Sequence, residues 1–256
     1  MQLRLIRNAT FVLDFGGHRL LVDPFFAPKH VFPSFAGVSK NPTVDLPYPS
    51  EEIMDGVEVV IVSHLHPDHF DPVAQEQLPK SLPIFCQPGD DDAIRSHGFD
   101  QVHPITDAVE WHNIRITRID GHHGLGPVEQ EMGVVSGFVF EAANEPKVYW
   151  AGDTVLCEEV ETAIHTHAPD IIITHSAGAM WPDPQNTDQR VLIIMDAAQT
   201  IDTAKIAPQS RLVAIHMEAL DHGTVSRSEL RQAASDANIP EHWLLIPADG
   251  ETLELV

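Results

Sequence analysis

A dense group of side chains that could bind metal lies in the sequence HLHPDH, which begins at His64. Imidazole nitrogens and carboxylate oxygens are ligands for divalent metals, and this segment offers three of the first kind and one of the second. His64 and His66 alternate by two residues, so in an extended chain their side chains share one face. Pro67 then turns the chain, so that Asp68 and His69 face a different point. The spacing therefore indicates that one segment serves two adjacent metals.

The element that must position this segment is the apolar run VEVVIV at residues 57–62. Its β-branched residues and its short length predict a strand that is covered on both faces. The histidines then lie just past the carboxyl end of the strand, where the chain leaves the sheet. A solvated histidine-rich loop is the less favoured interpretation, because surface loops seldom place three histidines and an aspartate directly after a buried strand.

The sequence HLHPDH resembles the HxHxDH signature of the metallo-β-lactamase-fold hydrolases, a specific pattern when it follows a hydrophobic strand. The resemblance extends over nearly the whole chain, with the other landmarks in the expected order. It implies an αββα sandwich, an α/β fold in which two mixed sheets pack face to face, helices lie outside and metals sit at one edge. It covers residues 1–256 as one domain, and the branch that the chain resembles includes the ascorbate-6-phosphate lactonase-like proteins.

The other landmarks supply the remaining candidate ligands. Asp153 stands in the sequence GDT after a predicted strand, and the resemblance implies that this aspartate bridges both metals through its two carboxylate oxygens. His216 follows another buried strand and matches the last landmark, a ligand of the second metal. The third landmark is a lone histidine, where this chain has the neighbours His122 and His123. Adjacent residues of an extended chain point to opposite sides, so only one of them can join the first metal. The resemblance assigns His123, which precedes Gly124.

The resemblance thus implies a complete ligand set for two metals. The first metal would be held by His64, His66 and His123, and the second by Asp68, His69 and His216, with Asp153 shared. Two divalent cations lower the pKa of a bridging water to about neutral, which gives a hydroxide nucleophile at pH 7. The catalytic group is therefore expected to comprise His64, His66, Asp68, His69 and Asp153. Zn²⁺, Mn²⁺ and Fe²⁺ all suit these ligands; the resemblance implies Zn²⁺ most often, and Mn²⁺ in the lactonase-like branch.

Six further residues are expected to support the ligands or to contact substrate: Asp23, His122, His175, Glu218, His222 and Arg227. The resemblance implies that Asp23 braces the metal site, and a turn-capping role before a proline is equally consistent with its position. His175 ends a buried strand, where a purely structural histidine fits as well. Arg227 also fits the first turn of a helix that Ser226 caps, with Glu229 completing a capping box.

Two long segments are predicted to border the same edge of the fold. Residues 24–50 contain six prolines, which oppose regular structure, and five aromatic residues, which need burial. A lid over the site and a flap packed against the fold explain this segment equally well. Residues 176–190 contain Gly178, Trp181, Pro182, Pro184 and Asn186, and predict a second loop. Cys157 is expected one turn into a helix that begins near Val155, packed rather than ligating.

Composition and charge limit the partners. The net charge is −23, from 15 Lys and Arg against 38 Asp and Glu. This charge argues against binding to nucleic acids and against contact with anionic membranes, because both are negatively charged. The two cysteines lie far apart, and the amino-terminal sequence lacks the features of a signal peptide, so we expect a reduced, cytoplasmic protein. The sequence is also compatible with a homo-oligomer.

The complete ligand set favours catalysis. We expect a metal-dependent hydrolase that directs a metal-activated hydroxide at a small ester, lactone, amide or phosphoester. The alternative is a non-hydrolytic member of the same fold, which would use these ligands for redox chemistry or for sensing. Metal content together with turnover of a substrate panel separates the two hypotheses.

Overall fold

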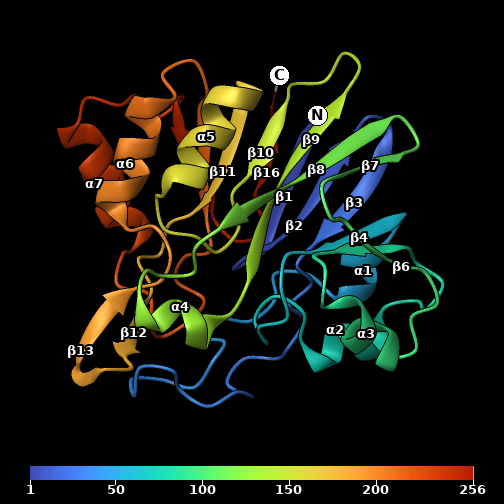
Figure 1. The fold of residues 1–256 in the computed structure, drawn as a ribbon, viewed down its shortest axis with the longest axis horizontal. Coiled ribbons are helices and arrows are strands. Elements are labelled where there is room, and N and C mark those ends of the chain that lie inside the picture. Colours follow the sequence, from blue (N-terminus) through green and yellow to red (C-terminus); the bar gives the residue numbers. More distant parts are fainter. Residues whose placement is uncertain (256) are drawn as a thin grey trace.

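Two seven-stranded sheets pack face to face in the computed structural model, which describes residues 1–255, and helices cover the outer face of each sheet (Figure 1). This arrangement confirms the predicted αββα sandwich. Both sheets are mixed, because antiparallel hairpins build one part of each and crossover connections build the parallel part.

The first sheet has the strand order β16-β1-β2-β3-β4-β5-β6. Its strands are β1 (Gln2–Arg7), β2 (Thr10–Phe15), β3 (His18–Val22), β4 (Val59–Val62), β5 (Ile84–Cys86), β6 (Val102–Pro104) and β16 (Thr252–Glu254). Three helices accompany it, namely α1 (Ser50–Met54), α2 (Pro72–Gln77) and α3 (Asp91–Ser96). The strand β4 pairs in parallel with β3 on one side and β5 on the other, so the predicted buried strand before His64 is an interior strand.

The second sheet has the strand order β15-β14-β11-β10-β9-β8-β7. Its strands are β7 (Ala108–Trp111), β8 (Ile114–Gly121), β9 (Val135–Ala142), β10 (Val148–Trp150), β11 (Ile171–His175), β14 (Arg211–Ile215) and β15 (Leu244–Leu245). Four helices accompany it, namely α4 (Pro127–Met132), α5 (Glu158–His167), α6 (Ala197–Ile206) and α7 (Arg227–Asp236). The strands β10, β11, β14 and β15 run parallel, so their carboxyl ends meet at one edge.

The core consists of three apolar layers. The central layer lies between the sheets and contains Phe11, whose ring meets Trp150 edge-on at a centroid distance of 5.6 Å. Alternation along β2 divides the side chains, because Phe11 and Leu13 enter the central layer while Val12 enters the layer beneath α1–α3. The third layer packs under α5, α6 and α7. Packing on both faces fixes the register of the strands and hence the positions of the residues that follow them.

The segment at 176–190 is not the predicted loop. It contains a two-stranded hairpin, β12 (Met180–Asp183) and β13 (Asn186–Leu192). Most of its residues are exposed or half-buried and polar, so the hydrophobic alternation that marks a strand is absent. Pro182 is tolerated because this ribbon has only two strands, each with a free edge.

Side chains cap the starts of α2 and α7. The carboxylate of Asp71 accepts hydrogen bonds from the first turn of α2, and Ser226 forms the predicted capping box with Glu229 at the start of α7. Arg227 is the first residue of that helix. Cys157 was expected one turn into a helix, and it is instead the half-buried residue just before α5.

The segment from residue 24 to residue 49 is irregular, as predicted, and two charged side chains hold it in place. The guanidinium of Arg7 donates to the carbonyl oxygens of Phe25, Ala27 and Val44 at 2.9–3.1 Å. At the other end the carboxylate of Asp221 accepts from the backbone amides of residues 35, 36, 38 and 39 and from side chains of the same stretch. This segment, α4 and the β12–β13 hairpin border the same edge of the sandwich (Figure 1).

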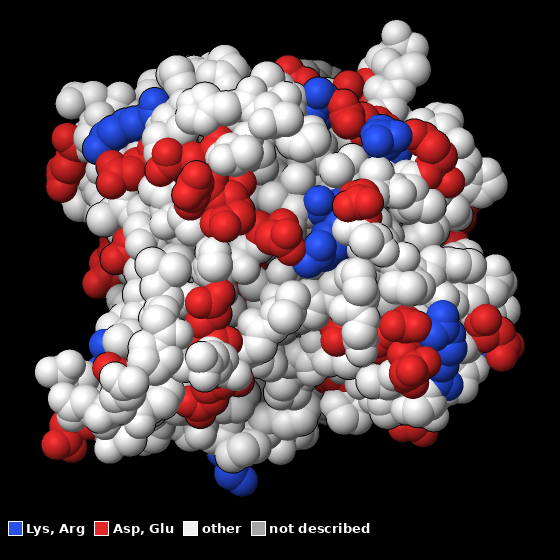
Figure 2. All heavy atoms as spheres, viewed as in Figure 1, with Lys and Arg blue, Asp and Glu red and all other residues white. Residues whose placement is uncertain are grey.

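Figure 2 shows acidic side chains in separate groups scattered over this face, with fewer groups of Lys and Arg among them. This distribution agrees with the net charge of −23. Among the helices of residues 1–255, we find none whose length and hydrophobicity would let it cross a membrane.

Candidate metal centre

The predicted ligands converge at one edge of the sandwich because each follows the carboxyl end of a strand. The segment 64–69 follows β4 in the first sheet. In the second sheet, His123 follows β8, Asp153 follows β10 and His216 follows β14, while His175 is the last residue of β11. Residues that are far apart in the sequence therefore meet across the two sheets.

Three histidines form a first cluster, in which ligand nitrogens of His64, His66 and His123 all lie within 4.8 Å of one another. His122 is not part of it. The Nδ1 atom of His123 donates to the carbonyl oxygen of Ile193 at 2.8 Å, which leaves its Nε2 atom free to accept or to bind a cation. The Nε2 atom of His64 is buried and has no hydrogen-bond partner among the described residues. A buried polar atom without a partner is costly, so this cluster fits a bound cation.

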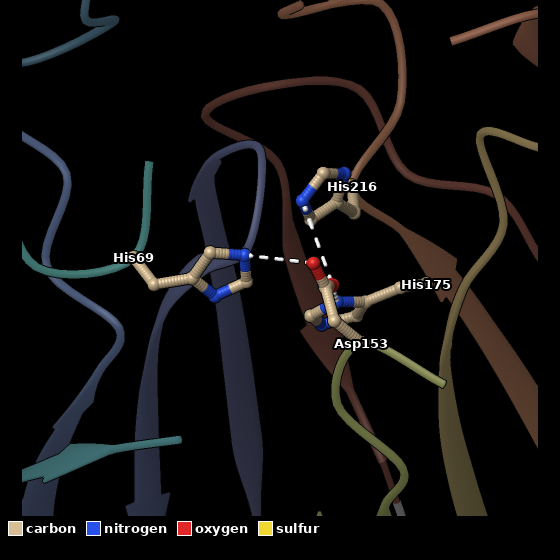
Figure 3. Close-up of side chains that lie close together, drawn as sticks. All are labelled: His69, Asp153, His175 and His216. Atoms are coloured by element: carbon tan, nitrogen blue, oxygen red, sulfur yellow. Dashed lines mark hydrogen bonds and ion pairs between the residues drawn. The ribbon is translucent and has the colours of Figure 1, made fainter. Parts of the chain in front are cut away.

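A second cluster surrounds the carboxylate of Asp153 and comprises His69, His175 and His216 (Figure 3). One carboxylate oxygen of Asp153 lies 3.1 Å from Nε2 of His69, and the other lies 3.6 Å from Nε2 of His216. The first of these oxygens is also 3.5 Å from Nε2 of His123. Asp153 therefore lies between the two clusters, where a carboxylate can bridge two cations.

Asp68 lies beside the second cluster. One of its carboxylate oxygens is 3.2 Å from Nε2 of His216 and 3.4 Å from Nε2 of His69. The side chain of Asn8 donates to this oxygen at 3.1 Å, and its nitrogen lies 3.3 Å from Nε2 of His216. No sequence motif marks Asn8, because it lies in the turn between β1 and β2, 208 positions away from His216.

His175 is fully buried behind Asp153, and its hydrogen bonds define its tautomer. The indole N–H of Trp150 donates to Nε2 of His175 at 3.0 Å, so this nitrogen carries no proton. The proton must then be on Nδ1, which contacts the carboxylate of Asp153. Burial lowers the pKa of His175 to about 4, so the ring is neutral at pH 7. The arrangement orients Asp153 rather than exposing His175 to a ligand.

Asp23 performs a similar orienting task at the first sheet. Its buried carboxylate accepts from the backbone and hydroxyl of Ser63 at 2.8 and 2.7 Å, and from Nδ1 of His69 at 2.6 Å. The hydroxyl of Ser63 in turn lies 2.9 Å from Nδ1 of His64 and accepts its proton. Both imidazoles therefore carry the proton on Nδ1 and direct Nε2 toward the cluster, as metal-binding histidines do.

The electrostatics of the two clusters differ. Burial lowers the pKa of His64 well below its ordinary value and that of His123 to about 4, so these imidazoles are neutral. Burial also opposes charge on His69, yet the carboxylates of Asp153, Asp68 and Asp23 raise its pKa well above its ordinary value. The proton on Nε2 of His69 thus balances buried carboxylates that a divalent cation would balance instead.

A cavity of about 310 Å³ opens onto the two clusters. It is lined by Phe35, His66, Pro67, Asp68, His123, Glu131, Met132, Asp153, Trp181, Ile193 and His222. Phe35 comes from the irregular segment and Trp181 from the β12–β13 hairpin, and their rings meet at a centroid distance of 6.3 Å. Phe35 also contacts the ring of His222 at 5.3 Å. The segment at 24–50 therefore acts both as a packed flap and as part of the cavity wall.

Of the six residues predicted to support the ligands or to contact substrate, His222 alone is among the lining residues named above. Arg227 is buried, and its guanidinium pairs with Glu218 at 2.7 Å and donates to the carbonyl oxygen of Pro247 at 2.8 Å. The ring of His122 lies between the carboxylates of Glu129 and Glu159. The polar groups of Arg227 and His122 are therefore paired with residues of the chain and not with a ligand in the cavity.

The comparisons with known proteins agree with this geometry. The family model for the beta-lactamase superfamily domain matches residues 18–217. The chain is 36% identical over 258 residues to the UPF0173 protein YddR of Bacillus subtilis (strain 168), covering 98% of this chain and 99% of that protein. A solved structure described as a possible metal-dependent hydrolase from Veillonella parvula DSM 2008 is 36% identical, with a TM-score of 0.93 over 100% of this chain and 99% of that one. The isothiocyanate hydrolase from Delia radicum gut bacteria is 35% identical, with a TM-score of 0.92 over the same shares.

Proposed function

Because the chain belongs to the metallo-β-lactamase-fold hydrolases of the β-lactamase superfamily, and is thus a metal-dependent hydrolase, we propose that it hydrolyses a small uncharged electrophile with an apolar substituent at a site for two metals. The observation that carries this proposal is the cavity itself, in which an apolar and aromatic wall faces the histidines and carboxylates of the candidate centre. An uncharged substrate with a hydrophobic group fits such a surface.

The charge of the cavity favours neutral substrates over phosphoesters. Its described lining includes the carboxyl groups of Asp68, Glu131 and Asp153 and no Lys or Arg. An anionic phosphoester would have to rely on the metals alone to offset these carboxylates. Of the four predicted substrate classes, esters, lactones and amides therefore fit better. An isothiocyanate fits as well, and the similarity to an isothiocyanate hydrolase adds this class to the proposal.

The donor set fits two divalent metals, Zn²⁺ foremost, with Mn²⁺ and Fe²⁺ compatible. The first metal would be held by His64, His66 and His123, and the second by Asp68, His69 and His216, with Asp153 between them. When bound, such metals supply a hydroxide nucleophile at neutral pH and polarise the electrophile. The chain's own contribution begins with Asp23 and His175, which orient two of these ligands.

The remaining residues would act on the substrate. Phe35, Trp181 and Met132 would hold its apolar group and exclude water from it. Although burial opposes ionisation, the imidazoles of His69 and His216 lower the pKa of Asp68 well below its usual range, so its carboxylate can accept a hydrogen bond from an attacking water.

His222 provides a further polar group at the cavity, because its Nδ1 atom is buried and has no partner among the described residues. We infer that the imidazole of His222 forms a hydrogen bond with the heteroatom of the substrate. For an isothiocyanate, addition of water across the carbon–nitrogen double bond and cleavage of the carbon–nitrogen bond would give an amine and carbonyl sulfide, with both protons of water ending on the amine.

A substrate panel tests the proposal. The metal-loaded protein is offered an arylalkyl isothiocyanate, an aryl ester, a lactone and a phosphodiester, and we expect kcat/KM to be highest for a neutral compound with an apolar group. Trp181→Ala should lower that kcat/KM about 10- to 100-fold with unchanged metal content, because it removes one wall of the cavity. Trp243→Ala, at a surface remote from the cavity lining, is the matched control. Preference for the phosphodiester, or equal effects of both substitutions, would contradict the proposal.

A further inference from the structure

A second group of metal-ligating side chains lies outside the cavity. Ligand atoms of His122, Cys157 and Glu159 all lie within 4.8 Å of one another, and all three residues are half-buried. They come from the loop after β8, from the residue that precedes α5 and from the first turn of α5. None of them is among the candidate ligands of the two metals described above.

Backbone hydrogen bonds fix the two segments that carry this group. The amide of His122 donates to the hydroxyl of Thr154 at 2.9 Å, and the amide of Val155 donates to the carbonyl oxygen of His122 at 2.9 Å. The same hydroxyl of Thr154 lies 3.7 Å from the sulfur of Cys157. Gly121 permits this close approach, since a Cβ atom there would lie 3.0 Å from Cβ of Thr154. The three side chains are therefore held together by a framework that needs no ion to form.

The imidazole of His122 has the orientation of a metal-binding histidine. Its Nδ1 atom contacts the carboxylate of Glu129 on α4, and its Nε2 atom faces Glu159 at 3.2 Å. A carboxylate at one ring nitrogen holds the proton there and presents the other nitrogen to a cation. Here that second nitrogen is the one directed toward the thiol and carboxylate of the cluster.

We propose that His122 Nε2, Cys157 Sγ and a carboxylate oxygen of Glu159 bind an additional Zn²⁺ ion. One nitrogen, one sulfur and one oxygen donor form a set that zinc accepts in tetrahedral sites, and three protein ligands leave a fourth position for water. Binding releases the thiol proton to solvent, because the thiolate is the ligand form of cysteine. Cys157, expected from the sequence to be packed only, thereby becomes a ligand.

The position of this site gives it a consequence for the candidate centre. His122 is adjacent to His123, and Cys157 follows Asp153 by four residues. An ion bound to both segments cross-links the loop that positions His123 to the segment that positions Asp153. Such a link stabilises the folded state by mass action as the zinc concentration rises above its dissociation constant. The site therefore adds a zinc-dependent link to the backbone hydrogen bonds that already join these two segments.

Cobalt binding tests the proposal without an activity measurement. The protein with its two metals in place is titrated with Co²⁺, and we expect one further equivalent to bind with a thiolate-to-cobalt charge-transfer band. Cys157→Ser should abolish the band, and Glu129→Gln should weaken binding about 10-fold because it loses the charged partner of Nδ1. Cys86→Ala is the matched control, since Cys86 is buried in β5, and should leave the band unchanged.

Thiol alkylation provides the second measurement. Zn²⁺ should protect Cys157 of the wild-type protein from iodoacetamide, and it should protect less when Glu159 is replaced by Gln. A protein that binds no further equivalent of cobalt would overturn the proposal, as would a band that survives Cys157→Ser or an alkylation rate that zinc does not change. His122 would then serve only as an ion-paired link between α4 and α5.

Discussion

Replacing Asp23 with Asn should reverse the tautomers of two histidines at once. The carboxylate of Asp23 faces three donors, which are the amide and hydroxyl of Ser63 and Nδ1 of His69. The amide group of Asn has only one acceptor oxygen, so its nitrogen must face at least one of these donors. If the oxygen stays at the backbone amide of Ser63, His69 must move its proton to Nε2, and Ser63 must donate to His64 instead of accepting from it.

The expected loss follows from the number of histidines affected. Each reversed histidine presents a protonated Nε2 to the position where a metal would bind, and loss of such an orienting partner costs about 10- to 100-fold in metal affinity. His64 belongs to the first predicted metal and His69 to the second, so each metal should lose about 1.4–2.7 kcal/mol of binding free energy. Chelator competition with Zn²⁺, in a Cys157→Ser background that removes the additional site, measures both affinities.

Ser63→Ala separates the two branches of this network. It removes the acceptor of His64 Nδ1 and leaves the contact between Asp23 and His69 in place. Only the first metal should then bind more weakly, whereas Asp23→Asn should weaken both. Asp14→Asn, which removes a half-buried carboxylate paired with Arg19, is the control and should change neither affinity. Wild-type affinities in Asp23→Asn would refute the tautomer argument.

Three further predictions follow from other contacts. Trp150→Phe keeps an aromatic ring but removes the donor to His175, so the second metal should bind about 10-fold more weakly in the same chelator competition. Phe11→Ala should lower the free energy of unfolding of the metal-free protein, measured in urea, by about 3–5 kcal/mol, because it opens a cavity between the sheets. The control Val31→Ala, at an exposed position, should change this free energy by less than about 0.5 kcal/mol. Asp221→Asn should release residues 35–39 and speed their proteolysis about 10-fold. Burial opposes ionisation of Asp221, but hydrogen bonds from Ser34, Asn41 and the loop amides lower its pKa below the ordinary value. The carboxylate therefore stabilises the loop fully above its unfolded pKa of about 4, and this stabilisation is lost only as the pH falls through the lower folded pKa. The difference between the wild-type and variant rates should therefore be constant from pH 5 to pH 8, and a difference that fades within that range would contradict the assignment.

The sequence was sufficient for the parts of the fold that local patterns determine. The β-branched run before His64 and the strand before His216 are interior strands, as their continuous hydrophobicity predicted. The capping box at Ser226 was also recognisable, because it involves residues only three positions apart. The β12–β13 hairpin was missed for the opposite reason, since a polar ribbon that packs little of its surface leaves no hydrophobic pattern.

The contacts that orient the candidate ligands could not be predicted in the same way. Trp150 reads as an ordinary core residue, and its indole N–H acquires a partner only when β10 and β11 pair. Asn8 meets His216 only once the two sheets pack together. Cys157 likewise joins His122 through the pairing of two segments more than thirty residues apart. Such contacts depend on tertiary structure and leave no local signal.

Metal stoichiometry tests the central proposal most directly. The Cys157→Ser protein, saturated with Zn²⁺ and then dialysed, should contain two equivalents per chain by elemental analysis, and His216→Ala in that background should contain one. His216 contacts only the second cluster, so the first metal should remain. A protein that holds no metal after reconstitution, or a His216→Ala variant that still holds two, would contradict the two-metal site.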